Sequence, residues 1–182
     1  FDGQSELVRS LADHVLTIPG KRVRPTLLLL VAGMGNRLGP TAVRAAAMLE
    51  IVHTATLIHD DVEDGSELRR NERTLHRIHG VPIAVNFGDG MLAASMAPLL
   101  ENIELVGLGR ALRILQIVAR MARESAEGQM IELDWVRAAD WTPSERAYVR
   151  MIYKKSAWYT FLAPVLVGRT LARALQRDDM FV

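Results

Sequence analysis

The sequence contains no cysteine, few aromatic residues and almost no net charge. Without cysteine, the chain has no disulfide framework, no thiol nucleophile and no cysteine-based zinc or iron–sulfur site. Its 22 Lys and Arg residues nearly balance its 21 Asp and Glu residues. This balance excludes a general nucleic-acid or membrane-surface binder, because both need a strong field of one sign. Any recognition of phosphate must therefore be local.

Long hydrophobic runs are also absent. The longest, residues 26–34, is about half of the ~20 residues that span a bilayer, so it indicates a buried helix and no transmembrane segment. A chain without cysteine fits a reducing environment, and we expect it in the cytoplasm.

The sequence also shows signs of being incomplete. It begins with Phe1 and stops at Val182 within a helical pattern, so we expect both ends to be cut. Between Gly168 and Ala174, one helical pattern runs into another without the turn residues that two antiparallel helices need. We expect a segment to be missing there.

Apolar residues recur at helical spacing along nearly the whole chain, and no window alternates as a strand does. We predict an all-α protein with a single domain over residues 1–182. Residues 66–80 are expected to form a polar, basic loop, and Gly65 to end the helix before it. Another helix is expected to begin with Thr142 as its N-cap and to continue past Lys155. The other predicted helices cover residues 5–16, 25–35, 41–64, 82–100 and 108–136.

An acidic cluster, Asp60-Asp61-Val62-Glu63-Asp64, ends the predicted 41–64 helix. Asp60 and Asp64 are four residues apart and share one face, where like charges destabilise a helix by about 0.2–0.5 kcal/mol. A cation would offset this cost, and the hard oxygen ligands suit Mg²⁺, which takes one or two carboxylates together with water and substrate phosphate. The alternative is a solvated helix end, although acidic residues are unfavourable at a helix C-terminus.

His53 extends this acidic face along the helix. It lies seven residues before Asp60 and eleven before Asp64, so at ~100° per residue the three side chains point within about 40° of one another. A lone histidine there would be explained as a hydrogen-bonded core residue. Its alignment with two carboxylates favours a functional site.

Basic residues occur in two further groups. Lys21, Arg22 and Arg24 come just before the second predicted helix, and Arg69-Arg70 follow the acidic cluster. Arginine offers phosphate a planar fork of N–H donors, and lysine offers a compact charge. Such pairs are also common on surfaces, where they mean only solvation.

Lys154-Lys155-Ser156 lies in the middle of a predicted helix, beside apolar and aromatic residues. These lysines either bind a buried anion or extend their charged ends from an exposed helix face, and the spacing favours neither. Other polar residues on long helices are candidates to support a metal through hydrogen bonds. They are Asn86, Asp89, Glu127, Gln129 and Asp134.

Six motifs resemble those of the trans-type isoprenyl diphosphate synthases (polyprenyl synthetases), in that family's order and over nearly the whole chain. They are Gly20-Lys-Arg-Val-Arg-Pro25, His53 to Asp64 with the first aspartate-rich motif, Arg69-Arg70, Gly88-Asp89, Glu127-Gly128-Gln129, and Lys155-Ser156-Ala157 in place of the family's Lys-Thr-Ala. The resemblance implies an all-α helical bundle around a central cavity. Only its N-terminal and central part would be present, without the C-terminal helices.

The resemblance also implies a reaction, in which isopentenyl diphosphate condenses with an allylic diphosphate. In this family, metal-assisted loss of diphosphate leaves an allylic carbocation, the isopentenyl double bond attacks it, and a proton is removed. Catalytic roles would fall to Asp60, Asp61, Asp64 and Lys155. Asp60 and Asp64 would ligate Mg²⁺ that bridges the allylic diphosphate, with Asp61 supporting them.

Substrate contacts are implied in the same way. Arg69, Lys155 and Ser156 would contact the allylic diphosphate, and Gln129 would lie near metal-bound waters. Isopentenyl diphosphate would be held by Lys21, Arg24, His53 and Arg70. Family members pair as homodimers through long central helices, and the apolar residues 81–100 and 108–117 suit that role.

The second aspartate-rich motif departs from the family's pattern. The closest match begins at Gln176, where the glutamine is one residue too near the aspartates and the fifth position is Val182. Asp178 is its expected metal ligand, beside Asp179. The chain is therefore either part of an active enzyme, which the intact first motif favours, or a truncated and inactive piece.

Product length is predicted from the helix before Asp60. In this family the growing chain runs along the apolar face of that helix, and bulky aromatic residues four or five positions before the motif stop it early. Here those positions hold Thr56 and Ala55, so we predict a product longer than fifteen carbons.

Two other functions remain open. A class I terpene cyclase shares an aspartate-rich motif but binds a single diphosphate, and would not need Lys21, Arg24 and His53. A non-catalytic helical subunit of a heteromeric synthase would explain an incomplete second motif, but it has no evident use for the cluster at Asp60 to Asp64.

Overall fold

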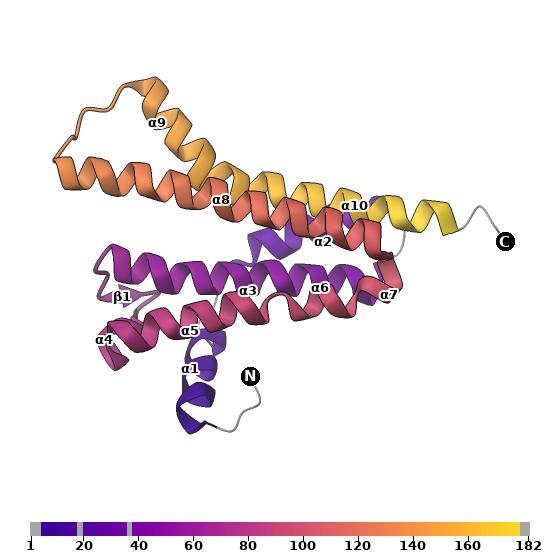
Figure 1. Cartoon of the computed structure of the whole chain (residues 1–182), viewed down its shortest axis with the longest axis horizontal. Helices are drawn as coiled ribbons and strands as arrows, with labels where there is room; N and C mark the ends of the chain where they lie inside the picture. Colours follow the sequence, from indigo (N-terminus) through magenta and orange to yellow (C-terminus); the bar gives the residue numbers. More distant parts are fainter. Residues whose placement is uncertain (1–4, 18–19, 36–37, 179–182) are drawn as a thin grey trace. The chain divides into compact units, whose positions relative to one another are not determined.

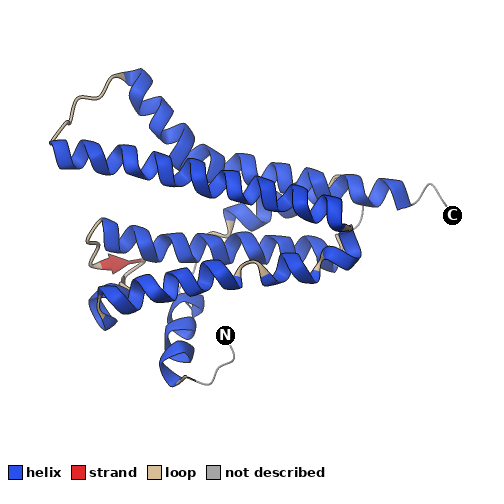
Figure 2. Cartoon of the chain, viewed as in Figure 1, coloured by secondary structure: helices blue, strands red, loops and turns tan. Residues whose placement is uncertain are grey.

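A computed structural model describes the backbone of residues 5–17, 20–35 and 38–178, and the side chains as far as residue 172. Helices make up nearly all of these ranges (Figure 2), and their strands are β1 (Leu68–Arg69) and β2 (Glu72–Arg73), of two residues each. The predicted all-α class is confirmed.

The helices follow one another along the chain (Figure 1). They are α1 (Glu6–Thr17), α2 (Val23–Gly33), α3 (Pro40–Glu63), α4 (Leu75–His79), α5 (Val81–Ala94), α6 (Ala97–Glu101), α7 (Ile103–Val106), α8 (Leu108–Ala138), α9 (Glu145–Ile152), the π-helix η1 (Tyr153–Leu162) and α10 (Ala163–Asp178). Most begin and end near the positions expected from sequence. Gly65 follows α3 with a φ of +62°, a left-handed conformation that glycine adopts easily, as predicted for a helix stop.

Three details of the predicted helices were wrong. Residues 66–80 are not a plain loop, because they contain the hairpin of β1 and β2 and the short helix α4. The 82–100 helix is broken: α5 ends at Ala94, and its C-cap Ser95 donates its hydroxyl to the carbonyl of Leu92 at 2.6 Å. The N-cap of α9 is Ser144, which accepts the Ala147 N–H at 3.3 Å, whereas the Thr142 N–H donates to Asp140.

The stretch from Gly168 to Ala174 contains no helix boundary. It lies inside α10, which runs from Ala163 to Asp178. The expectation of two helices there was wrong, and a single helix needs no turn residues at this point.

The chain divides into two compact units. The first comprises Phe1–Arg22 and Ala47–Leu100, and the second comprises Val23–Ala46 and Glu101–Val182. In the first unit, Leu11 of α1 packs with Ala55 and Ile58 of α3 and with Phe87 and Met91 of α5. In the second unit, α10 packs along α2 and α8, and η1 packs against α8. A single domain over the whole chain stays a prediction.

Two stretches are long and apolar enough to cross a membrane: Pro40–Glu63 and Val81–Glu101. Length and composition alone are weak evidence, because the core helices of soluble proteins pass the same test. The prediction that the chain has no transmembrane segment therefore remains open.

Candidate functional site

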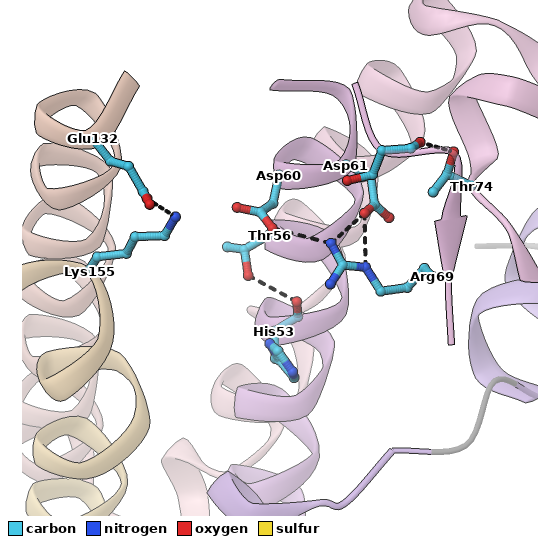
Figure 3. A network of polar contacts seen from close by, with 9 residues as sticks. His53, Thr56, Asp60, Asp61, Arg69, Thr74, Glu132 and Lys155 are labelled. Atoms are coloured by element: carbon cyan, nitrogen blue, oxygen red, sulfur yellow. Dashed lines mark hydrogen bonds and ion pairs between the residues drawn. The ribbon is translucent and has the colours of Figure 1, made fainter. Parts of the chain in front are cut away.

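The acidic cluster at the end of α3 is paired with an arginine from the hairpin (Figure 3). Arg69 Nε donates to Asp61 Oδ1 at 2.8 Å, and Arg69 Nη2 donates to Asp61 and, at 3.3 Å, to Asp60 Oδ2. The Asp61 side chain is almost fully buried, and 27% of the Asp60 side chain is exposed. Asp64 is exposed. The hydrogen bond to Asp61 raises the pKa of Arg69 above its usual value. Arg69 therefore supplies part of the positive charge that the sequence required near this cluster.

The β1–β2 hairpin determines where Arg69 lies. Arg69 pairs with Glu72, and the two residues between them, Arg70 and Asn71, have φ values of +54° and +72°. Positive φ at both central residues is typical of the type I′ turn, which matches the twist of a two-residue hairpin. The loop is closed at its base, where the buried Thr74 hydroxyl donates to the carbonyl of Ser66 at 2.8 Å.

A pocket that is open to solvent lies on the first unit beside this hairpin. One face of α3 forms a wall with Glu50, His53, Thr54, Leu57, Ile58 and Asp61. These six recur at helical spacing, and the remaining walls come from α1, Arg22, the hairpin and the start of α4. Basic or histidine side chains outnumber the two acidic ones: they are His14, Arg22, His53, Arg69, Arg70 and Arg73. The pocket is thus suited to an anion.

The pocket includes only one of the three residues, His53, Asp60 and Asp64, that the sequence places on one face of the helix. His53 and Asp61 line the pocket, whereas Asp60 and Asp64 are not among its lining residues. In the described ranges, no three His, Asp or Glu side chains converge as a metal site would require. Asp60 and Asp64 thus provide two carboxylates outside the pocket lining, and Asp61 is the aspartate of the cluster that lines the pocket.

Two lining residues had no specific role in the sequence-based prediction: Glu50 was missed, and Arg22 was named only among the basic residues suited to phosphate. They form an ion pair with each other, and Arg22 adopts a left-handed backbone with φ of +50°. Such a conformation is strained for a residue with a Cβ atom and often marks a functional position. Glu50 lies three residues before His53 on the same helix face, and that spacing is a signal that the sequence did contain.

The Gly20-Lys21 segment lies against the hairpin in the same unit. A Cβ atom added at Gly20 would lie 2.7 Å from Arg70 Nη1, so the arginine head packs on the backbone next to Lys21. Arg24 belongs to the second unit. Its Nη2 donates to Thr160 Oγ1 at 2.9 Å, and its guanidinium lies 4.3 Å from the Tyr159 ring centroid, so it contacts η1.

On the second unit, both lysines of η1 pair with glutamates of α8. Lys154 Nζ donates to Glu124 Oε2 at 2.7 Å and to Glu127 Oε2 at 2.8 Å, and Lys155 pairs with Glu132 (Figure 3). The Lys154 bond lowers the pKa of Glu124, and the Glu124 bond raises that of Lys154. Only 14% of the Lys154 side chain is exposed, so the alternative of lysines extending from an exposed face was wrong for it.

Gly128 allows α8 and η1 to approach closely. A Cβ atom at this position would lie 2.3 Å from the backbone nitrogen of Lys155. Gln129 and Ser156 are half-buried on the same two helices. The side chains of Asp178 and Asp179 lie outside the described residues, so the second aspartate-rich motif stays a prediction.

The other polar candidates have separate partners. Asp89 Oδ1 lies 3.3 Å from His59 Nε2, and Gly88 makes room for that histidine, since a Cβ atom there would be 2.5 Å from Nε2. Asp134 pairs with Arg137 on an exposed face, and Asn86 is exposed. Their predicted support of a metal is untested.

Comparison with known proteins gives consistent matches. A family model described as polyprenyl synthetase matches residues 5–181. The chain is 34% identical over 153 residues to the short chain isoprenyl diphosphate synthase of Methanothermobacter thermautotrophicus. The aligned residues cover 84% of this chain and 45% of that relative. It is 33% identical to the octaprenyl diphosphate synthase of Escherichia coli, with 84% and 44% covered.

Solved structures agree. A polyprenyl synthase from Caulobacter crescentus, complexed with calcium and isoprenyl diphosphate, is 32% identical with a TM-score of 0.82, covering 93% of this chain and 49% of that one. A geranylgeranyl pyrophosphate synthetase from Pyrococcus horikoshii is 28% identical with a TM-score of 0.84, covering 91% and 49%. The chain spans about half the length of the curated relatives it matches.

Proposed function

The chain belongs to the polyprenyl synthetase family, and from that premise we propose that it is a trans-prenyltransferase that condenses isopentenyl diphosphate with an allylic diphosphate. One observation carries the proposal: the pocket of the first unit gathers six basic or histidine side chains beside an aspartate-rich helix end. A diphosphate is an anion with several oxygens, and the arginine forks of Arg69 and Arg70 match it.

In this proposal the two diphosphates use different residues. His53 and Arg70, which line the pocket, bind isopentenyl diphosphate in this proposal, as do Lys21 and Arg24. Arg69, Lys155 and Ser156 bind the allylic diphosphate. The apolar wall residues Leu57 and Ile58 exclude water, which would otherwise quench a carbocation.

The acidic residues present fit Mg²⁺. Asp60 and Asp64 provide hard carboxylate oxygens, from a partly exposed and an exposed side chain, respectively. Mg²⁺ commonly takes one or two carboxylates and completes its shell with water and phosphate oxygens. Bound there, the ion would neutralise charge on the departing diphosphate. Asp61 has another task, since it holds Arg69 in place.

Incubation of the full chain with isopentenyl diphosphate, Mg²⁺ and dimethylallyl, geranyl or farnesyl diphosphate in turn tests this function, with products identified by mass spectrometry. We expect elongated diphosphates, and their loss in Asp60→Ala but not in Asp13→Ala, an exposed aspartate of α1. Hydrocarbon or alcohol products would favour the terpene cyclase. No product at all would favour the non-catalytic subunit.

We further propose a product longer than fifteen carbons. Relatives of this chain are named as geranylgeranyl and octaprenyl diphosphate synthases. The residues four and five positions before Asp60, Thr56 and Ala55, have small side chains. Ala55 is fully buried with Phe87 and Met91, while Thr56 is half-buried. Ala55→Phe should shorten the product, and Thr56→Phe repeats the test at a position with more room. An unchanged product distribution in both variants would contradict this.

A homodimer is also proposed. From Leu105 onward, α7 and α8 carry an exposed stripe of apolar residues at alternating spacings of three and four: Leu105, Leu108, Leu112, Leu115, Ala119, Ala122 and Ala126. This spacing is typical of a helix that packs on another helix. Leu112→Lys should convert the dimer to a monomer in light scattering, whereas Arg113→Lys, next to the stripe, should leave it unchanged.

A further inference from the structure

The lysine-bearing segment Tyr153–Leu162 is a π-helix of ten residues. π-Helices are rare and usually occupy a single turn, often at functional sites. A run of this length therefore needs support from the surrounding structure, and all the contacts that follow lie within the second unit.

The first support is the contact at Gly128. A Cβ atom there would lie 2.3 Å from the Lys155 backbone nitrogen and 2.7 Å from its Cα. Both atoms are backbone, which cannot turn aside as a side chain can. Only glycine thus permits this approach of η1 to α8.

The second support is Lys154, whose ammonium group bonds to Glu124 and Glu127, one α-helical turn apart on α8. Glu124 also approaches Arg120, with Arg120 Nε at 3.6 Å from Glu124 Oε1. The Arg120 guanidinium in turn lies 4.3 Å from the ring centroid of Trp158, which is 5% exposed. One glutamate of α8 therefore connects to two points of the π-helix, four residues apart.

We propose that Lys154 is a positioning residue: its bonds to Glu124 and Glu127 hold the π-helix against α8 and thereby set the direction in which Lys155 and Ser156 are presented. The proposal rests on the proposed function only for the identity of the ligand, an allylic diphosphate. Lys154 is bonded to two carboxylates and only 14% of its side chain is exposed, whereas Lys155 pairs with one carboxylate, Glu132, and is 29% exposed, so Lys155 is the residue offered to the substrate.

The first test is independent of activity. Hydrogen exchange of backbone amides in Ser156–Leu162 should be about tenfold faster in Lys154→Met than in the unaltered chain, since a charged hydrogen bond is lost. Exchange in α1 of the first unit should not change. Lys154→Arg should restore slow exchange, and Arg137→Met, which removes an exposed ion pair of the same helix α8, should have no effect.

The second test measures binding and kinetics. Lys154→Met should weaken the binding of inorganic pyrophosphate and raise the KM for the allylic diphosphate by about tenfold. The KM for isopentenyl diphosphate should stay within about twofold, and Lys154→Arg should recover most of the loss. A residue that merely stabilises the fold would not separate the two substrates. If Lys154→Met fails to fold, the Glu124→Ala and Glu127→Ala double variant removes the same bonds.

The outcomes separate the two proposals. Unchanged exchange in Ser156–Leu162 or an unchanged allylic KM in Lys154→Met overturns the positioning role, even in an active enzyme. If the unaltered chain makes no prenyl product, but Lys154→Met exchanges faster and binds pyrophosphate more weakly, the proposed function is overturned and the positioning role stands.

Discussion

The two units of this protein hold basic side chains against carboxylates in different ways. In the first unit, the arginines lie in or next to turns: Arg22 and Arg70 have positive φ, and Arg69 ends strand β1 just before the tight turn. In the second unit, Lys154 and Lys155 lie on a continuous helical segment, and partners on the adjacent helix α8 hold them. Backbone strain in the loops and close packing of helices are thus two routes to the same kind of electrostatic site.

The difference predicts how each region responds to change. A loop residue is positioned mainly by its own backbone conformation, so substitutions act locally. A residue on a packed helix depends on every neighbour along the contact, because well-packed interiors transmit small displacements. The first unit should therefore tolerate added volume better than the contact between α8 and η1.

The largest expected effects come from removing one basic side chain in each unit. Arg70→Ala should lower kcat/KM for isopentenyl diphosphate, and Lys155→Ala should lower it for the allylic diphosphate, each by about 10²–10³-fold, since each removes a charged donor to a phosphate. Steady-state kinetics with each substrate varied in turn checks this. If both variants affect the same substrate, the assignment of one diphosphate to each residue is wrong.

The next largest effects should come from glycine-to-alanine substitutions, whose changes in unfolding free energy should differ between the two units. Gly128→Ala should lower the free energy of unfolding by about 1–3 kcal/mol, because its Cβ atom would meet the Lys155 backbone. Gly109→Ala, on the same helix with nothing within 4 Å, should raise it by up to ~1 kcal/mol. In the first unit, Gly88→Ala should cost less than Gly128→Ala, since it meets the movable ring of His59. Urea denaturation measures all three, and a reversed order for Gly88 and Gly128 would contradict the comparison.

The stabilisation from the Lys154–Glu124 pair should depend on pH. The folded state lowers the pKa of Glu124 below its usual 4.5 and raises that of Lys154 above its usual 10.5. The stabilising contribution is therefore fully present between these values; it is lost as pH falls through the folded pKa of Glu124 and as it rises through that of Lys154.

Unfolding of Lys154→Met and of the unaltered chain, compared at several pH values, checks this dependence. The difference in unfolding free energy should shrink as the medium becomes acidic. Arg137→Met serves as the control, because its exposed pair with Asp134 should contribute little at any pH. A difference that stays constant down to strong acid would show that the ion pair is not its origin.

The smallest effect is expected in the hairpin. Asn71→Gly should stabilise the first unit by a few tenths of a kcal/mol, because glycine suits the second position of a type I′ turn. Asn86→Gly, at an exposed position inside α5, should instead destabilise by a few tenths. Thermal unfolding of the two variants tests this. Destabilisation by Asn71→Gly would contradict the view that the positive φ of Asn71 strains the turn.

Most of the fold was predictable because helices are local. The apolar period of α3 and α8, Pro25 in the first turn of α2, and Gly65 after α3 all act within a few residues of themselves. The hairpin at residues 68–73 was missed because strands of two residues carry no periodicity, and Ser95 was missed because its hydrogen bond to Leu92 competes with the helix only once the chain is packed.

The candidate site was predictable to a smaller extent. Six motifs in order pointed to the family and to residues such as His53, Arg69 and Lys155, because the chemistry of a diphosphate restricts which side chains can hold it. The pairing of Arg22 with Glu50 and that of Arg69 with Asp61 were not found, since each depends on a contact between segments that are separated along the chain.

By itself, then, the sequence determined the all-α class, the helix positions and the set of charged residues, because periodicity, capping and residue type are local properties. Only the tertiary structure decided which charges meet: Arg69 with Asp61, Arg22 with Glu50, and Lys154 with Glu124. It also decided that Tyr153–Leu162 is a π-helix that approaches α8 closely at Gly128, because that backbone pattern leaves no distinct period in the side chains.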